Sequence, residues 1–101
     1  MNDNEFNTLV EKTFGQIESI LEKDERLPDF SMVAPRVLEI ELPDNGTIVV
    51  SYHDPSREIW VAARKGAYHF RWDKECWQES RNHGELFDVL TRLLNTLGVD
   101  R

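Results

Sequence analysis

Apolar residues in this chain recur with the period of a helix at both ends and with the period of a strand in the middle. Near the N-terminus, one stripe at helical spacing predicts an amphipathic helix over residues 3–25, formed by Phe6, Leu9, Val10, Thr13, Ile17, Ile20 and Leu21. Asn2 is placed to cap this helix, with Glu5 three residues later as in a capping box. A second stripe from Leu86 to Leu97 predicts a C-terminal helix that ends at Gly98.

Between the helices, apolar and polar residues alternate, and turn signals divide this region into short strands. Asn45-Gly46 is a strong hairpin signal, and Pro55 and Gly66 mark further breaks. Strands grouped between two terminal helices predict an α+β fold. We expect a two-layer sandwich with two terminal helices packed on one face of a five- to six-stranded antiparallel sheet. A chain of 101 residues is expected to form one domain, residues 1–101.

The strand expected over residues 58–63 orients one tryptophan away from the core. Ile59 and Val61 alternate with Trp60, so that a core built from the first two leaves Trp60 on the opposite face of the sheet. The helices leave that face open to water, and His69 and Arg71 of the next strand are expected to share it. Because a large exposed aromatic residue marks a contact surface, this face is a candidate partner-binding site.

The first helix carries an unusual number of carboxylates. Residues 1–30 hold eight acidic and three basic residues. Four of the acids fall within about 60° of one another on the helix, opposite the apolar stripe: Glu11, Glu18, Glu22 and Glu25. A solubilising helix face and a weak surface site for hard cations, which prefer carboxylate oxygen, are both compatible with this pattern.

Composition argues against several classes of function. A net charge of −7 disfavours binding to nucleic acid, which requires a positive surface. Cys76 is the only cysteine, and no apolar run approaches the length of a membrane span, so we expect a cytoplasmic protein without a disulfide. The three histidines lack ligand spacing, and no nucleophile–base arrangement or glycine-rich phosphate loop is present. The residues therefore predict a protein that is not an enzyme.

Several segments, in this order, resemble the frataxin family, and in particular its bacterial branch. They are Met1-Asn2-Asp3-Asn4-Glu5-Phe6, Asn45-Gly46, Ile59-Trp60-Val61-Ala62, Gly66-Ala67-Tyr68-His69-Phe70, Trp77 and Gly84-Glu85. The resemblance implies a two-helix sandwich and weak binding of iron (Fe2+/Fe3+). It also implies attachment to the cysteine desulfurase and the scaffold protein of iron–sulfur cluster assembly, as an iron donor or regulator. We expect a monomer, and iron-dependent oligomerisation stays open as an alternative.

The resemblance also assigns roles to residues. It places the iron site on Glu18 and Glu22, with Glu11, Asp24, Glu25 and Asp29 as nearby contributors. It places the partner contact on Trp60, His69 and Arg71, together with Glu18 and Glu22.

This chain departs from the family pattern at several of the implied contacts. Ser19 and Lys23 stand where bacterial relatives commonly carry acids, while Ser51, His53 and Glu58 replace common amide residues.

Two alternative functions remain open from the sequence. One is a protein-interaction regulator of the desulfurase, for which iron binding is incidental. The other is a ferroxidase acting on the carboxylates. The ferroxidase is disfavoured because the chain lacks Glu-x-x-His pairs on facing helices.

Overall fold

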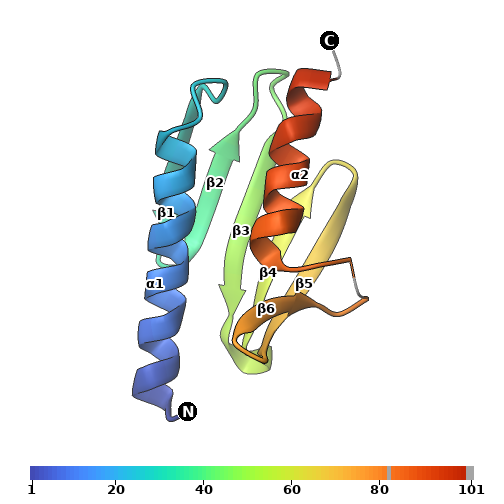
Figure 1. Cartoon of the computed structure of the whole chain (residues 1–101). Coiled ribbons are helices and arrows are strands. Elements are labelled where there is room, and N and C mark those ends of the chain that lie inside the picture. The colour runs from blue at the N-terminus through green and yellow to red at the C-terminus, as the bar shows by residue number, and fades with distance from the viewer. Residues whose placement is uncertain (82, 100–101) are drawn as a thin grey trace.

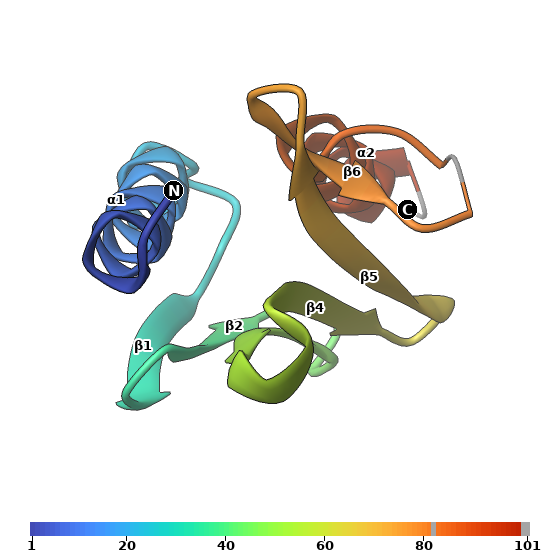
Figure 2. The ribbon, with the colours of Figure 1, turned by 90° about the horizontal axis from the view of Figure 1, so that it is seen from below.

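The computed structural model describes residues 1–81 and 83–99 as two helices packed on one six-stranded antiparallel sheet (Figure 1). The strands lie in the sheet in chain order, from β1 at one edge to β6 at the other. Both helices cover the same face, α1 beside β1 and α2 beside β5 and β6 (Figure 2). The predicted α+β sandwich is confirmed. The elements are α1 (Asp3–Glu22), β1 (Asp29–Ala34), β2 (Val37–Glu41), β3 (Thr47–His53), the 3-10 turn η1 (Asp54–Ser56), β4 (Glu58–Ala63), β5 (Gly66–Asp73), β6 (Cys76–Glu79) and α2 (Leu86–Val99).

Helix α1 begins as the sequence predicts but ends earlier. The Asn2 side chain accepts a hydrogen bond from the backbone N–H of Glu5 at 2.8 Å, and the Glu5 carboxylate accepts one from the backbone N–H of Asn2 at 3.0 Å. The predicted end at residue 25 is wrong, since the helix stops at Glu22. Beyond it, the Asp24 carboxylate accepts the backbone N–H of Arg26 at 3.1 Å, a local bond that competes with a further helical turn.

The buried stripe of α1 is rotated slightly from its predicted position. Phe14 is buried, although the sequence pattern left it out, and Ile20 is 37% exposed although the pattern included it. Val10 and Ile17 are fully buried and mark the centre of the stripe. Phe14 and Ile20 lie on opposite sides of that centre at 100° per residue, so the helix turns its Phe14 side toward the sheet.

The core fills the space between the two helices and the inner face of the sheet. Alternate residues of each central strand supply it, for example Ile59 and Val61 from β4, both with no exposed surface. Trp77 is the largest of its fully buried side chains. Its indole N–H donates to the hydroxyl of Thr13 at 3.1 Å, and this hydroxyl donates in turn to the carbonyl of Leu9 at 2.8 Å. Helix α1 and strand β6 are thus joined through a buried hydrogen bond.

Helix α2 packs its apolar stripe on the other half of the sheet. Leu86, Val89, Leu90 and Leu94 are buried. The packing of Leu97, which the sequence assigns to this stripe, lies outside the described side chains. The helix continues through Gly98 to Val99, so the predicted end at Gly98 is wrong. Neither helix, over the described ranges, combines the length and the apolar character required to cross a bilayer.

A buried carboxylate organises the connection between β6 and α2. Glu79 is 3% exposed, and its Oε1 accepts the backbone N–H groups of Arg81 at 2.8 Å and His83 at 3.3 Å. The Arg81 guanidinium lies 3.5 Å from the other carboxylate oxygen. Burial alone raises the pKa of Glu79, but these hydrogen bonds oppose that effect and hold the pKa below the ordinary value. The charged form of Glu79 therefore stabilises this connection.

Replacing Glu79 with glutamine is expected to lower the free energy of unfolding by about 2 kcal/mol at pH 7, because charge-assisted hydrogen bonds are lost. The folded pKa lies below the unfolded pKa, so the contribution is complete above about pH 4.5 and disappears as the pH falls through the folded pKa. Urea unfolding of both proteins between pH 7 and pH 3 measures this. The gap between wild type and Glu79→Gln should close at low pH; a gap that stays constant contradicts the assignment.

Candidate functional site

Three glutamates lie along one side of α1, and we name this set the acidic flank: Glu11, Glu18 and Glu22. Glu11 is held by Arg36 from the β1–β2 turn, whose Nε donates to Glu11 Oε2 at 2.7 Å. Arg36 also donates to the Asn7 side chain at 3.1 Å. The acidic flank therefore faces the β1 side of the molecule, and one of its three carboxylates already has a cationic partner.

The acidic flank lies beside the core rather than opposite it. Glu18 is half-buried, whereas Glu11 and Glu22 are exposed. At 100° per residue, Glu18 lies only about 40° from the buried Phe14. The predicted position opposite the apolar stripe is therefore wrong, because the stripe turns its Phe14 side toward the sheet.

The other candidate metal ligands lie beyond the end of the helix and do not extend the acidic flank. Asp24 accepts two hydrogen bonds from the Arg26 guanidinium, at 2.8 Å and 2.7 Å. The pKa of Asp24 lies below its usual value, mainly because of this Arg26 contact. Asp29 accepts the backbone N–H of Phe30 at 2.8 Å, at the start of β1. Glu25 is exposed and, placed after the helix end, does not continue the helical row as predicted.

The remaining carboxylates suit a weakly held cation better than a chelated one. Within residues 1–81 and 83–99, the side chains of Glu18, Glu22 and Glu25 form no ion pair or hydrogen bond. Those of Glu11 and Asp24, in contrast, are each paired with an arginine. Over the same residues, no group of three or more acidic, histidine or cysteine side chains converges to hold a metal ion. Carboxylate oxygens are the donors that hard cations prefer. The acidic flank therefore offers suitable donor chemistry without a preformed coordination shell.

The open face of the sheet carries an aromatic stack centred on Trp60. The His53 ring lies 4.2 Å from one face of the indole, and the His69 ring lies 4.6 Å from the other, both nearly parallel to it. His69 is the direct cross-strand partner of Trp60, and His53 reaches the stack from β3. Trp60 is only half-buried in this arrangement. The predicted outward orientation of Trp60 is confirmed.

Glu58 fixes the orientation of this stack. Its Oε1 accepts the indole N–H of Trp60 at 3.0 Å and the hydroxyl of Ser56 at 3.1 Å, and its Oε2 accepts Arg71 Nη2 at 3.2 Å. The pKa of Glu58 is lowered, first by the bond from Trp60 and then by those from Ser56 and Arg71. Ser56 Oγ also lies 2.8 Å from His53 Nδ1. One ionised carboxylate thus positions an aromatic side chain at the surface.

The structure brings together all three residues that the sequence assigns to this face and adds others. Trp60 and His69 pair across β4 and β5, and Arg71 pairs with Glu58 in the same register. Ser56 and the roles of His53 and Glu58 in this stack were not predicted from the sequence. Their contribution depends on the β3–β4 register, which sets His53 opposite Glu58 across the η1 turn. The one indication of this contact in the sequence was that His53 and Glu58 lie five positions apart on either side of Pro55.

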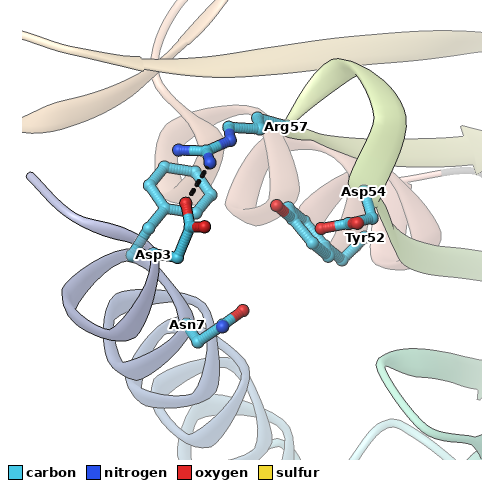
Figure 3. A pocket seen from close by; sticks show the side chains of 6 residues that line it. Asp3, Asn7, Tyr52, Asp54 and Arg57 are labelled. Carbon is cyan, nitrogen blue, oxygen red and sulfur yellow. Dashed lines mark hydrogen bonds and ion pairs between the residues drawn. The ribbon is translucent and has the colours of Figure 1, made fainter.

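A polar pocket of about 320 Å³ lies where the start of α1 meets the end of β3 (Figure 3). Asp3 forms an ion pair with Arg57, whose guanidinium also lies 5.1 Å from the centre of the Phe6 ring. Burial, and to a smaller extent the negative charge of nearby Asp54, raises the pKa of Tyr52. Its phenol is therefore protonated at neutral pH, as an ordinary tyrosine is. The pocket is therefore formed jointly by residues of α1 and of the β3–β4 turn. None of these residues is an activated nucleophile.

Comparisons with known proteins agree with this architecture. The model of the frataxin-like domain matches residues 1–98. A protein of Dechloromonas aromatica, named iron-sulfur cluster assembly protein CyaY, is 43% identical over 92% of this chain and 89% of its own length. A protein of the same name from Herminiimonas arsenicoxydans is 39% identical over 97% of this chain and 91% of its own length.

Solved structures of frataxins have the same fold. Frataxin from Psychromonas ingrahamii superimposes with a TM-score of 0.81 at 22% identity, over 93% of this chain and 89% of that one. A trimeric frataxin from the yeast Saccharomyces cerevisiae, solved in complex with ferrous iron, superimposes with a TM-score of 0.72 at 24% identity, over 96% and 88% of the two chains. These likenesses concern the arrangement of helices and strands.

Proposed function

This chain belongs to the frataxin family, and from that premise we propose that it serves iron–sulfur cluster assembly as an accessory protein without catalytic activity of its own. It carries iron as cargo, held weakly on the acidic flank of α1, and presents that iron to the cysteine desulfurase and scaffold protein. The proposed site of action is the cytoplasm. The names of its relatives support the pathway.

The observation that carries the proposal is the presence of carboxylates on α1 that form no ion pair with any basic side chain in the described part of the chain. Glu18 and Glu22 lie one helical turn apart, and the last turn of α1 contains no basic residue. Like charges at this spacing repel each other, and negative charge near a helix C-terminus is also unfavourable. Such an arrangement costs folding stability, and a bound cation relieves that cost. Within the acidic flank, Glu11 contributes less because Arg36 holds it.

The open face supplies a second contact, separate from the iron-binding residues. The half-buried Trp60 stands between two histidines in an orientation set by Glu58, ready to insert into a partner surface. Aromatic residues held in this way are frequent anchors of protein interfaces. We propose that this face binds the desulfurase–scaffold assembly, with His69 and Arg71 contacting the edge of the interface around Trp60.

A regulator that docks through the acidic flank and binds iron incidentally would use the same residues. What distinguishes it is an iron titration of the amide signals of Glu18 and Glu22 repeated with the desulfurase present: an iron carrier keeps its iron-induced shifts in the complex, whereas a regulator that docks through these carboxylates loses them. A ferroxidase is less favoured, because the described carboxylates do not converge on a metal-bridging site.

Reversing two charges in the double variant Glu18→Lys with Glu22→Lys tests the proposal. We expect the metal-free variant to gain about 1 kcal/mol of stability, or about 4–8 °C in melting temperature, because repulsion is relieved and the helix dipole is complemented. In wild type, Fe(II) should raise the melting temperature and shift amide signals around Glu18 and Glu22. The variant should show neither effect.

A matched control changes the same total charge elsewhere, in Glu75→Lys with Asp88→Lys, on the β5–β6 turn and α2. This control should keep the Fe(II)-induced amide shifts of α1. The proposal fails if the Glu18/Glu22 variant melts lower than wild type and yet still gains stability from Fe(II). It also fails if the two double variants lose iron binding equally, since the effect is then one of net charge only.

A further inference from the structure

A second pocket lies on the far side of the molecule from the acidic flank, where α2 passes over the turn between β4 and β5. It measures about 250 Å³. Lys65 enters it from the turn and Arg92 from α2, while Tyr68, His83, Val89 and Leu93 form most of its walls. None of the described residues that line it is acidic, although the whole chain carries a net charge of −7. Positive groups are therefore concentrated locally on an otherwise acidic protein.

The cations of this pocket are available to a ligand. Arg92 donates one hydrogen bond, from Nη2 to the carbonyl of His83 at 2.5 Å, which holds its guanidinium against the pocket wall. The other N–H groups of its planar fork remain for a bound anion. Throughout residues 1–81 and 83–99, neither Lys65 nor Arg92 forms an ion pair. Asp88, one turn before Arg92 on the same helix, does not line the pocket.

An adjacent pocket shares Lys65 and Leu93 with this one and also contains Asp44 and Arg64. Arg64, next to Lys65 in the turn, points elsewhere and pairs with Asp44 at 3.0 Å. A Cβ at Gly84 would lie 3.5 Å from Arg92 Nη2, an ordinary van der Waals distance, so Gly84 borders the guanidinium but is not needed to make room for it. Gly84 also has a φ of +121°, a backbone conformation that other residues rarely adopt. Glycine at position 84 is therefore explained by its backbone conformation, and the Arg92 guanidinium is held by its hydrogen bond to the carbonyl of His83.

The remaining walls suggest the size and chemistry of the ligand. Tyr68 supplies a phenol, which meets the His83 ring edge-on with centres 5.9 Å apart. Val89 and Leu93 add an apolar surface that favours a ligand with a carbon skeleton over a bare ion. The volume of 250 Å³ lies just below the usual range for drug-sized ligands, about 300–1,000 Å³, which limits the ligand to a small molecule.

We propose that this pocket binds a small organic anion with at least two negative charges, carried by carboxylate or phosphate groups. Lys65 and Arg92 contact the charged groups, the Tyr68 phenol donates a further hydrogen bond, and Val89 and Leu93 contact the carbon skeleton. Bidentate contacts from arginine suit both carboxylate and phosphate. The proposal is independent of iron binding, because α1 and α2 lie over different halves of the sheet (Figure 2).

The test is a titration of the whole protein followed by amide shifts. Citrate and glycerol 3-phosphate serve as the carboxylate and phosphate probes, and sodium chloride keeps the ionic strength constant. We expect saturable shifts at Lys65–Tyr68, at His83 and Gly84, and along residues 89–96, with one of the two probes binding more tightly. Arg92→Gln should weaken that binding about tenfold.

Lys65→Gln, on an exposed turn, repeats the test without touching a helix. Lys74→Gln removes one positive charge at the β5–β6 turn and should leave the affinity within about twofold of wild type. If Arg92→Gln loses structure, Lys65→Gln alone decides. The proposal is overturned if neither probe gives saturable shifts at these residues, or if Lys74→Gln weakens binding as much as the pocket variants do.

Discussion

Replacing Trp77 with alanine is expected to lower the free energy of unfolding by about 3–5 kcal/mol, the usual range for removing a large aromatic side chain from a core. Trp77 is 1% exposed and packs edge-on against Phe6 and Trp72, with ring centres 5.9 Å and 5.4 Å away. The change leaves a cavity and removes the hydrogen bond to Thr13. Small domains are stable by about 5–15 kcal/mol, so this loss removes from about a fifth to nearly all of the stability of the fold.

Urea unfolding followed by circular dichroism measures this loss. Trp77→Phe keeps most of the ring volume and loses the indole N–H, so it should cost about 1–2 kcal/mol, less than the alanine variant. Thr13→Val removes the acceptor from the other side and should destabilise in a non-additive way with Trp77→Phe. A loss below about 1 kcal/mol for Trp77→Ala would show that the two layers are not joined through this residue.

Replacing Trp60 with alanine is expected to change the stability of the free protein little and to weaken partner binding strongly. The indole is half-buried between His53 and His69 and contributes little to the core, so the melting temperature should stay within a few degrees of wild type. Binding to the desulfurase–scaffold assembly should weaken more than tenfold, because truncating an interface anchor typically costs 2 kcal/mol or more. Calorimetric titration of the assembly with both proteins measures this difference.

Glu58→Gln serves as the companion variant, because an amide keeps the size of Glu58 but removes the charge that Trp60, Ser56 and Arg71 share. It should weaken assembly binding less than Trp60→Ala does, while leaving the indole in place. If Trp60→Ala unfolds the protein, or if binding falls only in proportion to lost stability, the open face is not the contact surface.

The order of the elements and the orientation of the sheet were predictable from hydrophobic period alone. Ile59 and Val61 are buried on the inner face of β4, so Trp60, which lies between them in the sequence, projects from the opposite face. The capping box at Asn2 and Glu5 was equally local, since both partners lie within one turn of chain. Such features depend on residues that are close together in the sequence, so the sequence alone is sufficient to predict them.

The composition of the acidic flank was harder to predict, because it depends on contacts between distant residues. Arg36 neutralises Glu11 from 25 positions away. The roles of His53 and Glu58 likewise require the register between β3 and β4, which depends on the geometry of the η1 turn between them. The sequence therefore identifies the helix that carries the acids but not which of them remain unpaired.

The sequential strand order has a consequence for how the protein is made. Each strand pairs with the next one along the chain, so the sheet can grow by one short loop closure after another as residues leave the ribosome. Helix α1 is different, because the hydrogen bond between Thr13 and Trp77 joins residues 64 positions apart. Synthesis proceeds at about 5–20 residues per second, so the part of α1 that contacts Trp77 waits several seconds for strand β6. One end of the first helix to be synthesised therefore completes its packing only when β6 arrives, and during that interval the nascent chain leaves apolar surface of α1 exposed to aggregation.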